Sequence, residues 1–295
     1  MVDEQVLLLP DQVFSVEVID TLRPAIEAAY GDGGLDAWNS GLTSTNYSHP
    51  VQHAAVLLYG LAANEAWRRK RPEPAAVIGH SLGIYAAAVG AGAISPVDAV
   101  RLVLAAGAGI ERAQRATGLV LLAVTGLTAP RLKEILAPDG GAGEVRITHY
   151  NSTIQHIVSG HEETLTEIAR KAERDGALGT TILPFPGVVH RPDLAPFADD
   201  FYAIIDEVEV RPPRTRFYSP VCGGLVETAT GLRAAIRDQL TAPVRFLHAV
   251  HGMAPDGIDE FAVLGPCAQL VVIIRWLCPE ARASLFPSAV EEVHR

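Results

Sequence analysis

Residues 75–92 contain the feature that most restricts the fold: a short buried strand, a glycine-bounded turn and a helix. Residues 75–78 are apolar, the turn reads Gly79-His80-Ser81-Leu82-Gly83, and residues 84–92 have helical composition. The turn fits the pattern G-x-S-x-G, in which a serine on a tight turn stands clear at the end of a strand. The flanking glycines carry no Cβ, so neighbouring backbone can approach closely. A strand that leads directly into a helix in this way indicates an α/β protein.

In residues 117–185 the pattern of apolar and polar residues changes. It predicts elements in the order β-α-β-β-α-β, the ferredoxin-like split βαβ pattern. The expected strands are 119–124, 144–150, 155–159 and 179–184, and the expected helices are 129–136 and 162–174. We therefore expect a ferredoxin-like small subdomain at 117–185. It would be inserted into a large α/β-hydrolase-like catalytic subdomain with a parallel sheet, formed by 1–116 and 186–295.

The other elements follow from helical spacing and from short apolar runs. Strands are expected at 6–9 and 260–264, a loop at 31–45, and helices at 16–30, 49–68, 96–116, 193–208, 231–240, 245–253 and 268–277. Pro96 directly after Ser95 is a typical start of a helix.

Composition argues against several classes of protein. The 295 residues include 24 Lys and Arg against 34 Asp and Glu, a net charge of −10, which weighs against nucleic-acid binding. The longest apolar runs, 83–94 and 262–274, are shorter than the ~20 residues that a membrane span requires. Acidic residues stand near the N-terminus where a signal peptide would carry positive charge. The three cysteines (Cys222, Cys267, Cys278) are far apart, so we expect a reduced, cytoplasmic protein without a metal site.

Ser81 is the candidate nucleophile, and the Leu82 N–H at the start of the next helix is a candidate oxyanion donor. A serine needs a base to act as a nucleophile at neutral pH. Ten histidines compete for this role, and composition alone does not choose among them. His80 is adjacent to Ser81 but points in a different direction, whereas His190 lies in a loop bounded by proline and glycine. The others considered are His149 and His156 in the small subdomain, His248 and His251 on a helix, and His294 at the tail.

The segment GHSLGIYAAAVGAGAIS resembles the GHSLGEY segment of malonyl-CoA:acyl-carrier-protein transacylases and of polyketide synthase acyltransferase domains. Further segments resemble this family in the same order along the chain. They are 9–12, 45–50, 151–155, 158–160, 189–192, 242–246 and 264–267.

The resemblance implies a ping-pong acyl transfer with no bound cofactor. Ser81 would attack an acyl thioester on coenzyme A or on a carrier protein, and His190 would take its proton and return it to the leaving thiol. Gln12 would be the second oxyanion donor, and a backbone carbonyl near Arg245 would orient the histidine. The acceptor would be the phosphopantetheine thiol of an acyl carrier protein, an acidic partner that binds transiently.

The sequence departs from this family where malonyl enzymes hold the substrate carboxylate. Alignment of the helix after the turn puts Ala106 at the position of their arginine, and a methyl group cannot replace a bidentate guanidinium. The residues before His190 include Gly187 and Val189, which indicate a roomy, apolar pocket, and His80 is a further candidate substrate-binding residue. Arg191 could replace the missing arginine.

The leading hypothesis is therefore a discrete acyltransferase that loads a non-carboxylated acyl group (alkanoyl, aminoacyl or larger) onto a carrier protein in polyketide or fatty-acid-type biosynthesis. Arg112, Arg115 and Arg191 are candidate docking residues for that carrier protein. The alternatives are a malonyl transacylase with its arginine elsewhere, an editing hydrolase that uses water as the acceptor, a true α/β-hydrolase, and a degenerate binding partner of a synthase.

Overall fold

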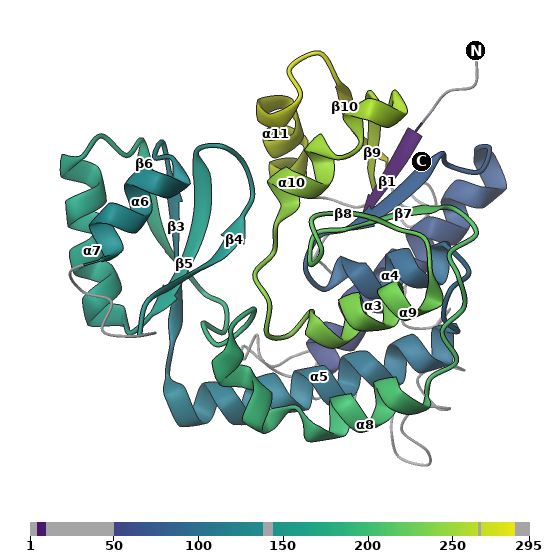
Figure 1. Ribbon diagram of the computed structural model, residues 1–295, viewed down its shortest axis with the longest axis horizontal. Helices are drawn as coiled ribbons and strands as arrows, with labels where there is room; N and C mark the ends of the chain where they lie inside the picture. The colour runs from purple at the N-terminus through teal and green to yellow at the C-terminus, as the bar shows by residue number, and fades with distance from the viewer. Residues whose placement is uncertain (1–4, 10–49, 138–143, 265–266, 287–295) are drawn as a thin grey trace, which may run out of the picture.

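The computed structural model describes residues 5–9, 50–137, 144–264 and 267–286. Two sheets lie side by side, each with its own helices (Figure 1). The expected helix at 16–30, the loop at 31–45 and Gln12 lie outside the described residues. No helix within the described part of the chain is both long enough and apolar enough to cross a membrane.

The larger sheet has six strands in the order β10-β9-β1-β2-β7-β8. Their bounds are β1 Gln5–Leu9, β2 Ala76–Gly79, β7 Arg216–Ser219, β8 Gly224–Val226, β9 Glu260–Leu264 and β10 Arg282–Phe286. The pairs from β10 to β7 are parallel, and only the edge strand β8 runs antiparallel to its neighbour. The α/β fold with a parallel sheet is thus confirmed, with an antiparallel hairpin added at one edge.

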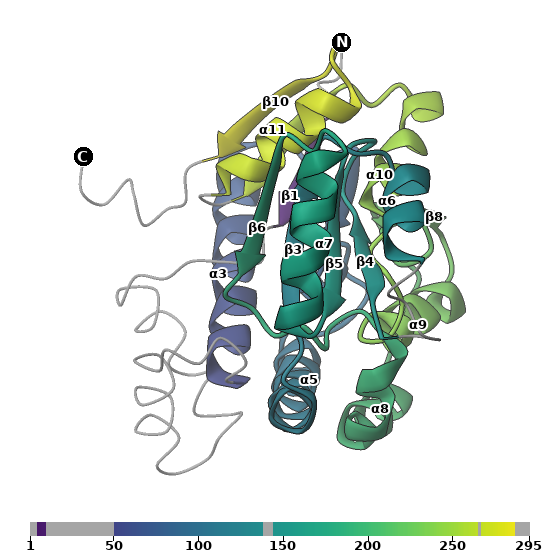
Figure 2. The ribbon, with the colours of Figure 1, turned by 90° about the vertical axis from the view of Figure 1, so that its left-hand side faces the viewer.

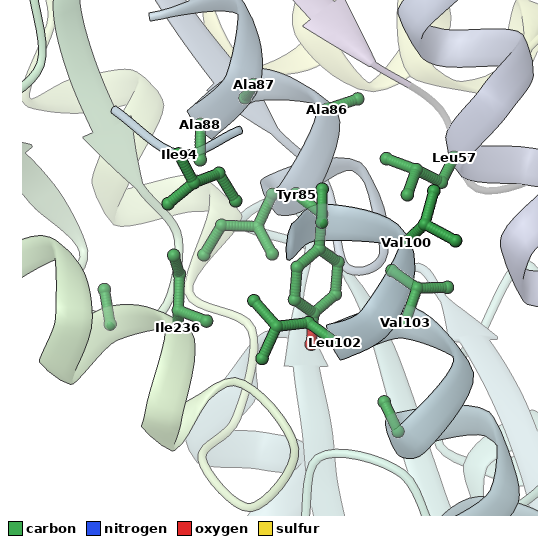
Figure 3. Close-up of a cluster of buried hydrophobic side chains, with 14 of the residues drawn as sticks. Leu57, Tyr85, Ala86, Ala87, Ala88, Ile94, Val100, Leu102, Val103 and Ile236 are labelled. Carbon is green, nitrogen blue, oxygen red and sulfur yellow. The ribbon is translucent and has the colours of Figure 1, made fainter. Parts of the chain in front are cut away.

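Helices cover both faces of the larger sheet, as the alternation of side chains along β2 requires. Val77 belongs to one core, whereas Ala76 and Ile78 belong to the core on the opposite face. The first core is formed with α3 (Pro50–Lys70), α4 (Gly83–Gly90), α5 (Pro96–Thr117), α8 (Asp199–Glu207) and α9 (Ala229–Asp238). The second is formed with α10 (Phe246–His251) and α11 (Ala268–Leu277). Figure 3 shows Tyr85 of α4 packed against Leu102 of α5 in the first core.

Local sequence signals set the bounds of α5. The Ser95 side chain accepts a hydrogen bond from the Asp98 N–H, and Pro96 occupies the first turn. Ser and Pro are favoured there because the first N–H groups of a helix have no partner within it. Gly118 ends the helix in the left-handed conformation, at φ 61°.

The smaller sheet is antiparallel, in the order β4-β5-β3-β6. Its strands are β3 Val120–Thr125, β4 Arg146–Tyr150, β5 Gln155–Gly160 and β6 Gly179–Leu183, and its helices are α6 Ala129–Leu136 and α7 Glu162–Arg174. The helices cover one face of the sheet (Figure 2), where Leu122, Val158 and Leu165 form part of a separate core. This is the ferredoxin-like topology, within residues 117–185. The subdomain boundaries themselves stay a prediction.

The larger unit differs from the sequence-based prediction in two ways. The helix expected over 193–208 is split into a 3₁₀ helix, Pro192–Phe197, and α8, because Pro196 cannot donate a helical hydrogen bond. The strands β7, β8 and β10 were not expected. Each has three to five residues, and β7 and β10 begin with an arginine, so none forms a long apolar run.

Candidate active site

Ser81 lies at the sharp turn between β2 and α4, with a positive φ of 48°. A Cβ on Gly79 would lie 2.2 Å from the backbone carbon of Gly83, so residue 79 has to be glycine for the turn to close. The motif therefore has a steric basis: two backbone segments touch, and the serine takes a conformation that L-residues adopt rarely. The half-buried hydroxyl stands at the C-terminal end of a central strand.

The structure brings His190 to Ser81, although the two are 109 residues apart in the chain. Its Nε2 lies 2.7 Å from the Ser81 Oγ, and its Nδ1 lies 2.8 Å from the carbonyl oxygen of Gln239. A carbonyl oxygen can only accept, so Nδ1 carries the proton and Nε2 is left to accept from the serine hydroxyl. This is the tautomer that a general base requires.

The carbonyl that orients His190 belongs to Gln239 and not to a residue beside Arg245, which corrects the expected position. Gln239 is the C-cap residue, directly after the last residue of α9. The last carbonyl groups of a helix have no partner within it, so one of them can accept from an imidazole. The partially negative end of a helix also favours the imidazolium that forms when the base takes a proton.

His190 is buried, and burial is the main cause that lowers its pKa from 6.5 to about 4. Nearby His80 lowers the pKa further, whereas the backbone carbonyl groups of Gln239 and Ala242 act in the opposite direction. The imidazole is therefore neutral at neutral pH and available as a base.

The amide of Leu82 is suitably placed for an oxyanion donor. The N–H groups of Gly83, Ile84 and Tyr85 donate to the carbonyl groups of His80, Ser81 and Leu82, respectively. No described residue accepts a hydrogen bond from the N–H of Leu82 itself. Its role as an oxyanion donor, like that of Gln12, stays a prediction.

His149 also lies at this site and was not selected from the sequence. Its ring centroid is 4.7 Å from that of His190 and 5.8 Å from that of His80. The His80 Nε2–H donates to the Oδ1 of Asn151, at 2.9 Å. Side chains two residues apart on a strand point to the same face, so His149 is expected on the side of Asn151, the residue that bonds His80. This spacing is the sequence signal that could have indicated His149. A β-bulge between Ile147 and His149 changes the direction in which the His149 side chain points, and no sequence pattern predicted this bulge.

The arginines that could have replaced the missing carboxylate clamp are engaged elsewhere. The Arg112 guanidinium donates to the Phe197 carbonyl at 2.9 Å and pairs with Asp200 at 3.2 Å. Arg191 pairs with Asp193 at 2.7 Å and donates to the Ser159 hydroxyl at 2.9 Å. Ala106 is 1% exposed, within the core that α5 shares with α3 and α4.

The structure corrects two of the residue assignments. Arg191 is 2% exposed and cannot reach the surface of a carrier protein, whereas Arg112 and Arg115 are exposed and stay candidates. A Cβ on Gly187 would lie 2.3 Å from the backbone of Leu119 and Val120, so this glycine permits a close backbone contact and does not enlarge an acyl pocket. Val189 is half-buried beside it and stays a candidate pocket residue.

A cavity of about 400 Å³ opens beside His190, between the smaller sheet and the loops that follow β6 and α9. Its lining includes Lys133 of α6, Arg146 and Tyr150 of β4, and Thr241 and Pro243. The two cations make this opening attractive to an anionic group.

A serine on a strand-to-helix turn that faces a neutral histidine, in an α/β fold, defines the class of enzymes that form acyl-serine intermediates. The acyl transferase domain family matches residues 6–279. The chain therefore belongs to this family and is an acyltransferase.

Two relatives and one solved structure illustrate the similarity. The chain is 26% identical over 260 residues to the malonyl CoA-acyl carrier protein transacylase of Bacillus subtilis, covering 88% of this chain and 80% of that protein. It is 28% identical over 239 residues to the polyketide biosynthesis protein ThaF of Burkholderia thailandensis, covering 81% of this chain and 20% of that protein. The structure of FabD from Acinetobacter baumannii matches with a TM-score of 0.84 at 22% identity, covering 100% of this chain and 97% of that one.

Proposed function

We propose that this acyltransferase moves a non-carboxylated acyl group from a thioester to the phosphopantetheine thiol of an acyl carrier protein, in polyketide or fatty-acid-type biosynthesis. The names of the relatives support a carrier protein as the acceptor. One similar structure, with a TM-score of 0.82, is a type II polyketide synthase acyl-carrier protein in complex with its malonyl-transacylase. The donor thioester would be carried by coenzyme A or by another carrier protein.

The first half-reaction loads Ser81. The serine oxygen attacks the thioester carbon while its proton passes to the Nε2 of His190, which lies 2.7 Å away. The negative charge that develops on the carbonyl oxygen would be met by the Leu82 N–H. The C–S bond then breaks, and the thiol leaves with the proton from His190.

The second half-reaction reverses these steps with a new thiol. The phosphopantetheine thiol gives its proton to His190 and attacks the acyl-serine, and Ser81 leaves with that proton. The cavity beside His190, lined by Lys133 and Arg146, suits the approach of an acidic carrier protein with a phosphodiester on its arm.

The observation that supports a non-carboxylated acyl group is the buried Ala106, together with the arginines that are engaged elsewhere. Arg101, another basic residue of α5, pairs with Asp98 and Glu207. The two cations of the cavity, Lys133 and Arg146, would serve the phosphodiester of the arriving arm, and Arg146 also pairs with Asp193 at 3.9 Å. A buried carboxylate that lacks a cationic partner would be costly, so an uncharged acyl group fits better. The names of the relatives favour malonyl as the second candidate.

The test is an acyl screen read by the intact mass of the protein. The wild type is incubated with equal concentrations of malonyl-, acetyl- and longer acyl-coenzyme A. We expect uncharged acyl adducts to form at least about 10-fold faster than malonyl, since an unpaired buried charge costs more than 1.4 kcal/mol. Malonyl as the preferred adduct would contradict the proposal.

Two controls complete this screen. Ser81→Ala should form no adduct with any donor, and an adduct on this variant would refute the choice of nucleophile. Addition of a carrier protein then shows where the acyl group goes: an acylated carrier indicates transfer, whereas free acid indicates the editing hydrolase.

A further inference from the structure

His149 is a buried imidazole beside the dyad that the mechanism above does not use. Its ring meets that of His190 edge to face, with centroids 4.7 Å apart and an interplanar angle of 81°. It also stacks on the ring of His80, with centroids 5.8 Å apart and an interplanar angle of 18°. We propose that His149 is a positioning residue: its ring holds His190 between Ser81 and Gln239 and keeps water away from it. This inference rests on the proposed function, because it concerns the base of that acyl transfer.

The backbone holds His149 firmly at this place. The residues on either side of it are tied to Val244, since the Val244 N–H donates to the Thr148 carbonyl and the Tyr150 N–H donates to the Val244 carbonyl, both at 2.8 Å. Val244 belongs to the segment that follows Gln239, which accepts from His190. The ring that packs against His190 and the carbonyl that orients it are therefore parts of one hydrogen-bonded unit.

The His149 side chain is itself held in place. Its Nδ1 lies 2.9 Å from the Thr148 hydroxyl, and the ring is buried within the cluster of three imidazoles. Edge-to-face packing of this kind restrains the neighbouring ring, and deletion of a buried ring leaves a space that water can enter. Water at that position would let the His190 ring turn away from Ser81 and would also solvate its charged form.

The electrostatic surroundings agree with this role. Burial lowers the pKa of His149 well below 6.5, with His190 and His80 adding to the effect, so its ring is neutral during turnover. The groups that face His190 are Ser81, His80, His149 and the carbonyl groups of Gln239 and Ala242, and Lys133, Arg146 and Tyr150 line the cavity beside it. The neighbouring Arg191 directs its guanidinium toward Asp193. A neutral ring at position 149 therefore acts on the pKa of His190 mainly through exclusion of water.

The experiment measures acylation of Ser81 by p-nitrophenyl acetate, which does not depend on the identity of the natural acyl group. The burst of p-nitrophenol is recorded after brief pH jumps between about pH 8 and about pH 4, and the acid limb of the second-order rate reports the free base. His149→Ala should raise the midpoint of that limb by about 1 pH unit, toward the value of a solvated histidine. It should also lower the plateau rate by about 10-fold.

Three further variants make the result specific. His149→Phe keeps a ring of similar shape and should leave the midpoint within about 0.3 pH units of the wild type. His149→Asn also opens the space and serves in place of the alanine variant if that one does not fold. His156→Ala removes another buried imidazole, on the adjacent strand β5, and should leave the acid limb unchanged.

Each other outcome contradicts the inference. A folded alanine or asparagine variant with the wild-type acid limb would show that the ring does not shield His190. A phenylalanine variant that behaves like alanine would show that ring packing is not the cause, and an equal shift in His156→Ala would indicate general loosening. If Ser81→Ala releases p-nitrophenol in the same burst as the wild type, the proposed dyad fails, and the role of His149 fails with it.

Discussion

At the scale of single residues, two strained positions determine what this site can do. Ser81 and His190 are the only residues other than glycine with a positive φ in the described part of the chain, at 48° and 58°. Strain of this kind costs about 1–3 kcal/mol at each residue and persists only where the surroundings enforce it. Here the close contact of Gly79 with Gly83 enforces the first. The two strained residues are also the two that share a hydrogen bond.

The contact beneath Ser81 yields a prediction. Gly79→Ala places a methyl group 2.2 Å from the backbone carbon of Gly83, so the turn has to open and the hydroxyl has to move away from His190. We expect acylation of Ser81 to fall by about 10²-fold, since misplacement by about 1 Å has that effect. Gly224→Ala is the matched control, because its Cβ would meet no atom within 4 Å. Equal acylation rates for the two variants, read by intact mass, would rule out the steric account of the motif.

At the scale of elements, strand β5 of the smaller sheet carries a buried histidine from which we predict a sensitivity of the fold to acid. His156 lies on β5 and is fully buried, facing Tyr150. Burial lowers its pKa from 6.5 to about 4, with Lys133 adding to the effect and the Thr153 backbone opposing it. In the unfolded chain this histidine takes up its proton near pH 6.5, whereas in the folded chain it does so only near pH 4.

The sign of this difference predicts how stability depends on pH. Between about pH 6.5 and pH 4 the unfolded state binds more protons, so the free energy of unfolding falls as the pH falls. His156→Val removes this contribution and keeps an apolar side chain suited to a strand. The melting temperature of the variant relative to the wild type should therefore rise from about pH 7 to about pH 5. The exposed His161→Gln is the control, and a constant difference for His156→Val across this range would argue against the prediction.

At the scale of the whole molecule, the site exists because two sheets meet. Ser81 and Gln239 come from the larger unit, His149 comes from the edge strand of the smaller sheet, and His190 lies in the loop that connects them. An isolated parallel bridge between His149 and Val244 joins the two units beside the dyad. The cavity with Lys133 and Arg146 opens at the same junction, so any partner that enters there contacts both units.

Charge reversal at this junction tests how the carrier protein approaches. The double variant Lys133→Glu with Arg146→Glu should raise the KM for an acidic carrier protein by about 10-fold or more at low salt, and less at high salt. Burst acylation by the uncharged donor p-nitrophenyl acetate should change far less than this KM, because the hydrogen bonds of His190 go to Ser81 and Gln239, whereas Arg146 pairs with Asp193. Arg174→Glu, on the exposed part of α7, is the control. An unchanged KM in the double variant would place the docking surface elsewhere, with Arg112 and Arg115 as the next candidates.

The sequence by itself determined the features that depend on neighbours along the chain. The turn at Ser81, the capped helix α5 and the order of elements in the small subdomain follow from local sterics, capping and periodicity, and each lies close to its expected range. Only the tertiary structure decided which groups surround His190. The Gln239 carbonyl is 49 residues away from His190 in the chain. A β-bulge and a bridge to Val244 place His149 beside His190. Such contacts depend on how separate elements pack, and no local pattern encodes the distance between them.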